Sequence, residues 1–286
     1  MQIEVLFSQW DQYELLDSGE GRKLERFGEV ILVRGEPRAW WKPSLPEREW
    51  NRAVAIHDER NWTFKPGAPR EWLLPCNGNT LLARFTETSK HVGVFPEQWP
   101  HWMRLAKHGE PVRDRKPRLL NLFGYTGAAT LAAVRAGFET THVDASKPAI
   151  AWGRRNQELS GLKDENIRFL LDDAIKFVKR EVRRGNRYEA VLLDPPAFGR
   201  GPNKELWKVD AQVADLLADC GQLLSDDARL VILTMYNTNA SALMLRNLLI
   251  DAMPHAGGSI EIGELALAHS SGDKVLPRSL WGVWQA

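Results

Sequence analysis

The chain has 286 residues, 43% of them hydrophobic, and its 38 lysines and arginines almost balance its 37 aspartates and glutamates. This length suits a large domain with or without a smaller companion, and the charge balance excludes a globally basic nucleic-acid-binding chain and an acidic disordered one. Without a signal peptide, an apolar run of ~18 residues or enough cysteines for a disulfide framework, we expect a cytoplasmic protein with no membrane association.

Residues 1–100 predict a small β-rich domain. Short β-prone runs cover residues 30–33, 81–85 and 91–95, and prolines interrupt any long helix. Eight of the 12 tryptophans precede residue 103, so the composition of this part differs from that of the rest. A basic, proline-containing connector is then expected over residues 101–117.

From residue 118 onward, predicted strands alternate with predicted helices. The strands are expected at 118–123, 138–144, 167–171, 188–194, 230–234, 259–268 and 280–285, and the helices at 127–136, 147–159, 174–184, 209–224 and 240–252. Such alternation is typical of a parallel sheet with right-handed crossovers. The last two strands leave no room for a helix between them, so we expect them to be partly antiparallel. Residues 118–286 therefore predict an α/β domain with a seven-stranded sheet, which is not the standard dinucleotide-binding arrangement.

Two glycines lie in the turn after the first strand of this region. Glycines allow a sharp turn there and let a ligand approach the N–H groups of the next helix, although an ordinary strand-to-helix turn would also use them. The spacing is Gly-x-x-Gly and not G-x-G-x-x-G, which favours a phosphate-free nucleoside over a pyrophosphate and disfavours an NAD-dependent oxidoreductase. The candidate cofactor-binding residues of the turn are Asn121, Phe123, Gly124, Tyr125, Thr126 and Gly127.

An acidic residue, Asp144, ends the second strand of this region. A carboxylate there can accept hydrogen bonds from both ribose hydroxyls of an adenosine, and capping of the next helix is the structural alternative. Ser146 is better placed for the cap because it directly precedes the predicted helix, which leaves Asp144 for a ligand. The candidate residues here are Asp144, Ala145 and Ser146.

Two aspartates follow the third strand. One of these carboxylates could accept the exocyclic amine of an adenine, while the next backbone N–H meets a ring nitrogen. Helix capping is again the alternative, and we expect one of the two to serve only as a cap. The candidate residues are Asp172, Asp173 and Ala174.

The fourth strand ends in Asp194 and is followed by two prolines, Ala197 and Phe198. Consecutive prolines fix φ and hold their carbonyl groups in a rigid loop. A purely structural loop is possible, but this one also offers a carboxylate, carbonyl acceptors and an aromatic ring to a planar substrate that carries N–H groups. The candidate catalytic residues are Asp194, Pro195 and Phe198, Asp194 is also a cofactor candidate, and Pro196 and Tyr236 are assigned to the substrate pocket.

All four groups lie at the carboxyl ends of successive parallel strands, where open α/β sheets bind ligands. With these stretches, residues 118–286 resemble a class I S-adenosylmethionine (SAM)-dependent methyltransferase, and within that class the 23S ribosomal RNA cytosine-C5 methyltransferases and their uncharacterised relatives. The matching stretches are 121–127, Asp144 with 156–162, Asp172 with Asp173, and 194–199.

Two earlier stretches, 13–28 and 91–98, are similar to the small domain and the pre-domain segment of those relatives. The resemblance therefore covers most of the chain. It implies a Rossmann-like seven-stranded methyltransferase sheet with a small N-terminal β-rich domain, SAM as the cofactor and a base of ribosomal RNA as the substrate. It also implies that Phe95 and Gln98 lie against the cofactor.

One part of the family pattern is missing. Methylation of cytosine at C5 needs a thiolate that adds to C6, and the family places this cysteine just after the fifth strand. This chain has Thr234 to Thr238 there, and its two cysteines are Cys76 and Cys220. Cys220 lies on the apolar face of a predicted helix, which indicates a core position. We therefore expect an acceptor with its own nucleophilic lone pair, such as a base nitrogen.

A basic surface could support an RNA substrate despite the near-zero net charge. Residues 176–187 hold six lysines and arginines and one glutamate, and the connector adds more, although a solvated helix face would look the same. The alternatives are a small-molecule or protein methyltransferase on this scaffold, or a SAM-binding RNA-interaction factor without turnover. The seven histidines lack metal-ligand spacing, so no metal is expected, and the sequence does not indicate an oligomeric state.

Overall fold

The computed structural model of the chain describes residues 2–58, 60–87, 89–253 and 257–286. The chain divides into two compact units. Unit 1 comprises Met1–Leu6, His101–Leu265 and Ser279–Ala286, and unit 2 comprises Phe7–Pro100 and Ala266–Arg278. The division into domains at 1–100, 101–117 and 118–286 stays a prediction. No helix in the described ranges is long and apolar enough to cross a bilayer.

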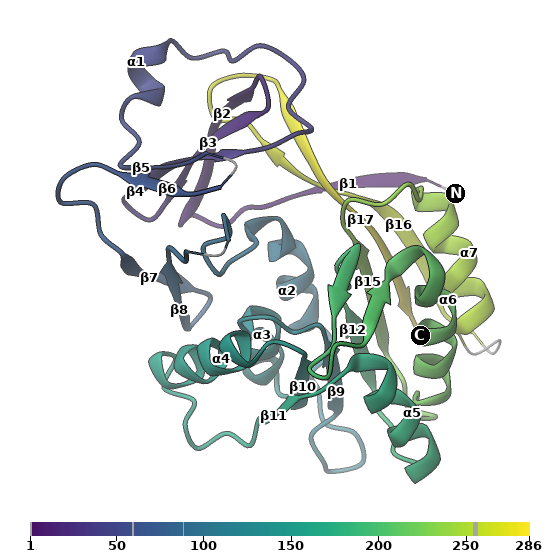
Figure 1. The fold of residues 1–286 in the computed structure, drawn as a ribbon. Coiled ribbons are helices and arrows are strands. Elements are labelled where there is room, and N and C mark those ends of the chain that lie inside the picture. The colour runs from purple at the N-terminus through teal and green to yellow at the C-terminus, as the bar shows by residue number, and fades with distance from the viewer. Residues whose placement is uncertain (1, 59, 88, 254–256) are drawn as a thin grey trace. The chain divides into compact units, whose positions relative to one another are not determined.

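Unit 1 is built on an eight-stranded sheet in the order β1-β16-β17-β15-β12-β9-β10-β11 (Figure 1). The strands are β1 (Ile3–Phe7), β9 (Arg118–Leu122), β10 (Glu139–Asp144), β11 (Arg168–Leu171), β12 (Ala190–Leu193), β15 (Leu230–Met235), β16 (Ser259–Ala268) and β17 (Val275–Gln285). The predicted mixed α/β fold is confirmed, and β1 is an eighth strand that the sequence did not predict. β9 to β12 and β15 pair in parallel, and β17 pairs antiparallel with β15, as expected.

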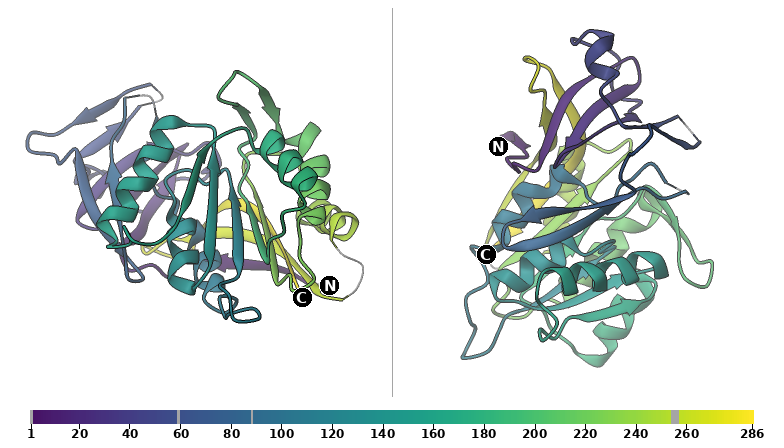
Figure 2. Two further views of the ribbon diagram at one scale, coloured as in Figure 1. Left: turned by 90° about the horizontal axis from the view of Figure 1, so that it is seen from below. Right: turned by 90° about the vertical axis from the view of Figure 1, so that its left-hand side faces the viewer.

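Helices cover both faces of this sheet (Figure 2). They are α3 (Ala128–Ala136), α4 (Lys147–Leu159), α5 (Ala174–Arg184), α6 (Val209–Gln222) and α7 (Ala242–Ala252), and each was predicted within two residues. α5, α6 and α7 pack on the face that carries Leu120 and Leu122, whereas α3 packs on the opposite face beside Leu119. Parallel strands covered on both faces need side chains that are apolar on both sides, which explains the uninterrupted apolar run of β12.

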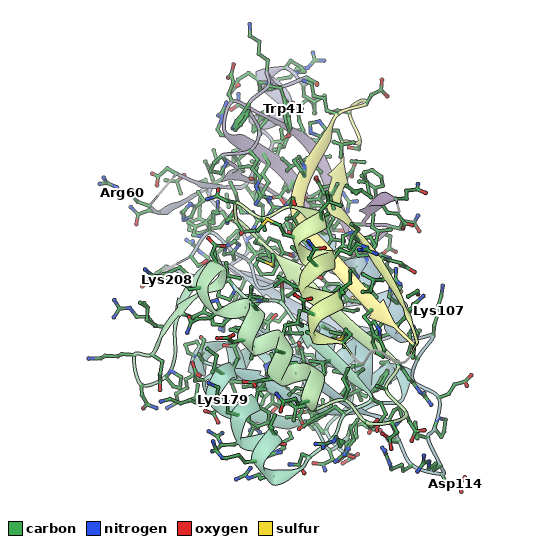
Figure 3. The ribbon with its side chains drawn as sticks, turned by 90° about the vertical axis from the view of Figure 1, so that its right-hand side faces the viewer. Trp41, Arg60, Lys107, Asp114, Lys179 and Lys208 are labelled. Carbon is green, nitrogen blue, oxygen red and sulfur yellow. The ribbon has the colours of Figure 1, made fainter. Side chains whose placement is uncertain are left out.

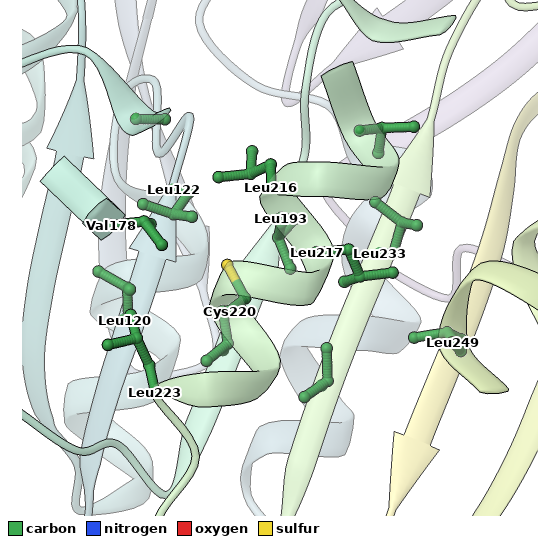
Figure 4. Packing of buried hydrophobic residues seen from close by; sticks show 14 of the residues in the cluster. Leu120, Leu122, Val178, Leu193, Leu216, Leu217, Cys220, Leu223, Leu233 and Leu249 are labelled. Atoms are coloured by element: carbon green, nitrogen blue, oxygen red, sulfur yellow. The ribbon is translucent and has the colours of Figure 1, made fainter. Parts of the chain in front are cut away.

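The larger core cluster contains a cysteine. Cys220 of α6 is fully buried, with its sulfur among leucines of the sheet and of α6, as Figure 4 shows. The predicted core position of Cys220 is therefore confirmed.

Unit 2 contains a five-stranded sheet in the order β2-β3-β4-β5-β6 and a separate β7–β8 hairpin. The strands are β2 (Tyr13–Gly19), β3 (Arg22–Phe27), β4 (Val30–Gly35), β5 (Ala55–His57), β6 (Trp62–Phe64), β7 (Glu71–Cys76) and β8 (Asn79–Arg84). Short helical segments are α1 (Glu47–Trp50) and η1 (Pro96–Gln98), and α2 (Trp99–Leu105) runs on into unit 1. The predicted β-rich character of this part is confirmed.

One strand prediction in unit 2 was wrong. Residues 91–95 form no strand, because Gly93 has a φ of 97° and breaks the extended backbone before η1 begins. The strand predicted at 81–85 exists as β8, which pairs with β7. Asn77 and Gly78, with φ of 45° and 77°, form the two-residue turn between them, as is typical of Asn-Gly hairpins.

Candidate active site

The register of the parallel strands places predicted site residues along one edge of the unit 1 sheet. Leu193 of β12 pairs with Leu122 of β9, which pairs with Val143 of β10. Asp144 pairs in turn with Leu171 of β11. Neighbouring strands lie about 4.8 Å apart, so the residues that follow these positions form a row. They are Asp194, Phe123, Asp144 and Asp172.

The glycine-containing turn at 121–127 has an unusual backbone. Phe123 and Tyr125 adopt left-handed φ angles of 57° and 50°, and Gly127 has a φ of 84°. Left-handed backbone at two side-chain-bearing residues is strained, at a cost of order 1–3 kcal/mol each, and such strain is concentrated at functional sites. The turn is fixed by a hydrogen bond from the Gly124 N–H to the Val143 carbonyl, at 3.1 Å. A second bond runs from Asn156 Nδ2 of α4 to the Thr126 carbonyl, at 2.9 Å.

The buried side chain of His142 packs against the glycine-containing turn at Gly124. A Cβ at Gly124 would lie 2.4 Å from Cε1 of His142, so the ring occupies the space that any larger residue would need. Asn121 Nδ2 donates to Thr130 Oγ1 at 2.9 Å, and Thr130 Oγ1 lies 2.8 Å from His142 Nδ1. Burial lowers the pKa of His142 to about 3, so the ring is neutral at physiological pH.

This arrangement also assigns a role to Asn121. Thr130 Oγ1 accepts from Asn121 and shares a second hydrogen bond with His142 Nδ1, so the three side chains form one buried chain. Asn121 therefore supports the turn through two buried side chains that the sequence did not single out. His142 and Thr130 lie inside predicted elements, so no turn or motif signal could have revealed them.

Asp144 links β10 to the glycine-containing turn. Its Oδ2 accepts from the Tyr125 N–H and its Oδ1 from the Ser146 N–H, both at 2.8 Å. Burial raises the pKa of Asp144, and the bonds from Ser146 and Tyr125 oppose this shift. The Ser146 hydroxyl accepts from the Ala149 N–H and caps α4, as predicted, with Ala145 half-buried between the two. Each carboxylate oxygen of Asp144 thus keeps one lone pair that can accept a hydrogen bond from a ligand.

The two aspartates after β11 have different partners. Asp173 accepts from the Lys176 N–H at 2.9 Å and caps α5, so the expectation that one of the pair is a cap is confirmed. Asp172 accepts from the Asp173 N–H at 2.9 Å and forms an ion pair with Arg180. Ala174 is the first residue of α5.

The loop after β12 is held by two residues that the sequence analysis missed. The hydroxyl of Thr234, near the end of β15, donates a hydrogen bond to Asp194 Oδ1. The indole N–H of Trp207 donates to the Pro196 carbonyl at 2.7 Å, and its ring lies 5.0 Å from that of Phe123. Trp207 therefore connects the proline loop to the glycine-containing turn.

The remaining candidates are placed as follows. Pro195 is buried, Pro196 is exposed and Tyr236, two residues after Thr234, is half-buried. Phe198 is 56% exposed. Phe95 and Gln98 belong to unit 2, where Gln98 ends η1, and their contact with a cofactor stays a prediction.

Both cysteines, Cys76 and Cys220, are buried. Burial raises the pKa of the Cys76 thiol in unit 2 to about 12, and it also raises the pKa of Cys220. The reactive form of cysteine is the thiolate, which both environments disfavour at neutral pH.

Comparison with known proteins identifies the fold and the cofactor. Residues 91–234, half of the chain, match the family model of the S-adenosylmethionine-dependent methyltransferases. The chain belongs to this family. This methyltransferase superimposes on the crystal structure of a SAM-dependent methyltransferase from Agrobacterium tumefaciens with a TM-score of 0.94 and 40% identity. That match covers 100% of this chain and 94% of the other.

Curated relatives match over shorter stretches. The methyltransferase is 29% identical over 163 residues to the ribosomal RNA large subunit methyltransferase K/L of Magnetococcus marinus, which is 56% of this chain and 21% of that protein. It is 30% identical over 123 residues to the ribosomal RNA large subunit methyltransferase I of Aeromonas salmonicida, which is 43% of this chain and 30% of that protein. The chain thus spans less than a third of the length of either relative.

Proposed function

We propose that this methyltransferase transfers the methyl group of SAM to a nitrogen atom of a ribosomal RNA base. The observation that carries the proposal is the row of polar groups at one sheet edge, with Asp144 and Asp194 on either side of the strained turn. Relatives named for ribosomal RNA of the large subunit support the choice of substrate. Such a substrate also agrees with a cytoplasmic location.

The cofactor is assigned to the strand ends around β9 and β10. Asp144 would accept the two ribose hydroxyls through the lone pairs that Tyr125 and Ser146 leave available. Asp172 or Asp173 would accept the adenine amine, with the Ala174 N–H toward the ring. The turn at 121–127 would hold the methionine end, and Phe95 and Gln98 are kept as further candidates.

The acceptor base is assigned to the loop after β12. Asp194, oriented by the Thr234 hydroxyl, would accept an N–H of the base, and the Pro195 carbonyl would accept another. Phe198 or Tyr236 would stack on the ring, with Pro196 beside it. When bound, SAM supplies an electrophilic methyl group on a positively charged sulfur. Asp194 and Pro195 then have one task, which is to aim the nitrogen lone pair at that methyl group.

A base nitrogen is favoured over C5 of cytosine as the acceptor because neither cysteine thiol is suited to form the adduct that C5 methylation needs. A C5 acceptor needs a thiolate adduct at C6. Cys220 is enclosed in the core and the pKa of Cys76 is raised to about 12, so neither supports this chemistry. A base nitrogen needs no adduct, since its own lone pair forms the new N–C bond as the C–S bond breaks. The extra proton on nitrogen is then lost to Asp194 or to water.

The decisive experiment supplies the purified protein and tritiated-methyl SAM to RNA from a strain that lacks the gene. We expect label in an N-methylated base of large-subunit ribosomal RNA, identified by nucleoside analysis. Label in 5-methylcytosine would contradict the argument from the thiols. Label confined to protein or small molecules, or binding of the cofactor with no transfer to any RNA, would contradict the RNA assignment.

Replacement of Asp144 by Asn is expected to weaken binding of S-adenosylhomocysteine about 10- to 100-fold. Two charge-assisted hydrogen bonds become neutral or are lost, a change of about 1.5–3 kcal/mol in all. Calorimetric titration measures the effect, with exposed Asp164→Asn as the matched control. Affinity equal to that of the wild type would rule out Asp144 as the ribose ligand.

The same carboxylate predicts a pH dependence of binding. The ionised form accepts the ribose hydroxyls, and burial raises the pKa of Asp144 above the usual value for aspartate. Affinity should therefore fall on acidification through this raised pKa, at a higher pH than an ordinary aspartate would give. Titrations across the acidic range should show the fall in the wild type and not in Asp144→Asn.

A further inference from the structure

Two short strands after the proline loop form an isolated ribbon. β13 (Phe198–Arg200) and β14 (Leu206–Lys208) pair antiparallel with each other and with no other strand in the described part of the chain. Phe198 pairs with Lys208, and Arg200 pairs with Leu206. The ribbon leads directly into α6, and Figure 2 shows it in green, extending outward from that helix.

The two faces of the ribbon differ sharply. Side chains alternate between faces along a strand, so the two register pairs share one face. Phe198 and Leu206 on that face are 56% and 51% exposed, and Arg200 and Lys208 beside them are also exposed. Trp207 points to the opposite face, where it is 4% exposed and bonded to the Pro196 carbonyl.

This pattern is not what folding alone requires. A ribbon anchored by one buried tryptophan gains little from a large apolar side chain on its solvent side. The outer face nevertheless has an aromatic ring and an aliphatic side chain, each directly opposite a cation. An aromatic ring with neighbouring cations suits a stacked base and its adjoining phosphates.

The ribbon and the turn between its strands carry a net positive charge, as a site for phosphates requires. Residues 198–208 contain Arg200, Lys204 and Lys208 against Glu205 alone, a net charge of +2 in a chain whose total is +1. Glu205 forms an ion pair with Lys176 of α5. Figure 3 labels Lys208 on the ribbon and Lys179 on α5.

The other basic segments are largely neutralised by carboxylates. Four cations of the connector and three of α5 form ion pairs within unit 1. These pairs are Arg104–Glu261, Arg113–Asp227, Arg115–Glu189, Lys116–Glu165, Lys176–Glu205, Arg180–Asp172 and Arg184–Glu181. The ribbon is therefore a better place for RNA than the connector that the sequence suggested.

We propose that the outer face of the β13–β14 ribbon binds single-stranded RNA next to the target base, with Arg200 and Lys208 on phosphates. Phe198 then stacks on a flanking base, which leaves Tyr236 of the two candidates to stack on the target base. The proposal rests on the proposed function, and it names the element that holds the substrate. Because Trp207 joins the ribbon to the Pro196 carbonyl, RNA held on the ribbon continues into the loop that contains Asp194.

The test measures binding of unmodified large-subunit ribosomal RNA by filter retention over a series of salt concentrations. Phe198→Ala should weaken binding about 5- to 100-fold, the range for loss of one stacked base. Arg200→Gln with Lys208→Gln should also weaken binding and reduce the slope of log K against log salt by about 1.4, since two phosphate contacts are lost. Affinity for S-adenosylhomocysteine should stay unchanged and show that the variants are folded.

Matched controls are Leu243→Ala, which removes an exposed side chain of α7, and exposed Lys163→Gln. Both should bind RNA as the wild type does. If the wild type methylates this RNA and the ribbon variants bind it normally, the ribbon proposal is overturned and the proposed function stands. If the wild type neither binds nor methylates the RNA, the proposed function itself fails. If the ribbon variants bind naked RNA normally and lose binding only to intact ribosomal subunits, the ribbon binds a protein partner and the RNA proposal is overturned.

Discussion

Gly124→Ala is expected to weaken binding of S-adenosylhomocysteine about 10- to 100-fold. The new methyl carbon would lie 2.4 Å from the ring of His142, far inside van der Waals contact. The ring cannot retreat easily, because it is buried, bonded to Thr130 and 4.8 Å from the ring of Phe169. Overpacking costs about 1–3 kcal/mol, and the turn must shift to relieve it. A shifted turn breaks the Tyr125–Asp144 hydrogen bond on which the proposed ribose site depends.

Two further variants show whether the histidine is the cause. Gly272→Ala is the matched control, since a Cβ there meets open space, and it should bind as the wild type does. His142→Ala added to Gly124→Ala removes the clash and should recover part of the lost affinity, a non-additive result typical of residues in contact. Wild-type affinity in Gly124→Ala, or no recovery in the double variant, would show that His142 does not shape the turn.

The sequence predicted the regular part of unit 1 well because its signals are local. Helices α4, α5 and α7 begin at side-chain caps, which are Ser146, Asp173 and Ser241. The buried parallel strands are short apolar runs between those helices. Acidic residues at strand ends could be recognised as site candidates for the same reason, since topology alone brings such ends to one edge.

What the sequence missed depends on contacts between distant residues. β1 joins the sheet beside β16, which lies more than 250 residues away along the chain. The β13–β14 ribbon has strands of three residues each, too short to show a period. The role of His142 becomes visible only when the turn at Gly124 is placed over its ring.

The missed residues share one physical property. His142, Thr130, Thr234 and Trp207 all support a neighbouring segment through a buried or half-buried hydrogen bond. A polar group in such a position must be satisfied, but its partner can come from any part of the chain. Candidate ligands at strand ends can thus be predicted from sequence, whereas the groups that hold them in place require the fold.

Glu25→Ala is expected to destabilise unit 2 by about 3–5 kcal/mol, the range for breaking a buried ion pair by removing one partner. Glu25 is 0% exposed and accepts hydrogen bonds from Tyr13 Oη at 2.8 Å and from Arg34 Nε at 2.7 Å. Lys23 Nζ lies 3.0 Å from the same carboxylate. Burial opposes ionisation of Glu25, but the Arg34 and Lys23 cations outweigh it and hold its pKa far below the usual range.

Removal of this carboxylate leaves two cations close together inside unit 2, where Lys23 and Arg34 are only 4% and 3% exposed. The carboxylate of Glu36 lies 3.9 Å from Lys23, but it already forms an ion pair with Arg278. It therefore cannot neutralise both Lys23 and Arg34. Urea unfolding followed by tryptophan fluorescence measures the loss, since most tryptophans lie in residues 7–100. Glu29→Ala is the matched control, because Glu29 is exposed in the turn that joins the same two strands, β3 and β4. Equal stability of the Glu25 and Glu29 variants would mean that water or a rearranged Glu36 replaces the carboxylate, and that Glu25 does not hold unit 2 together.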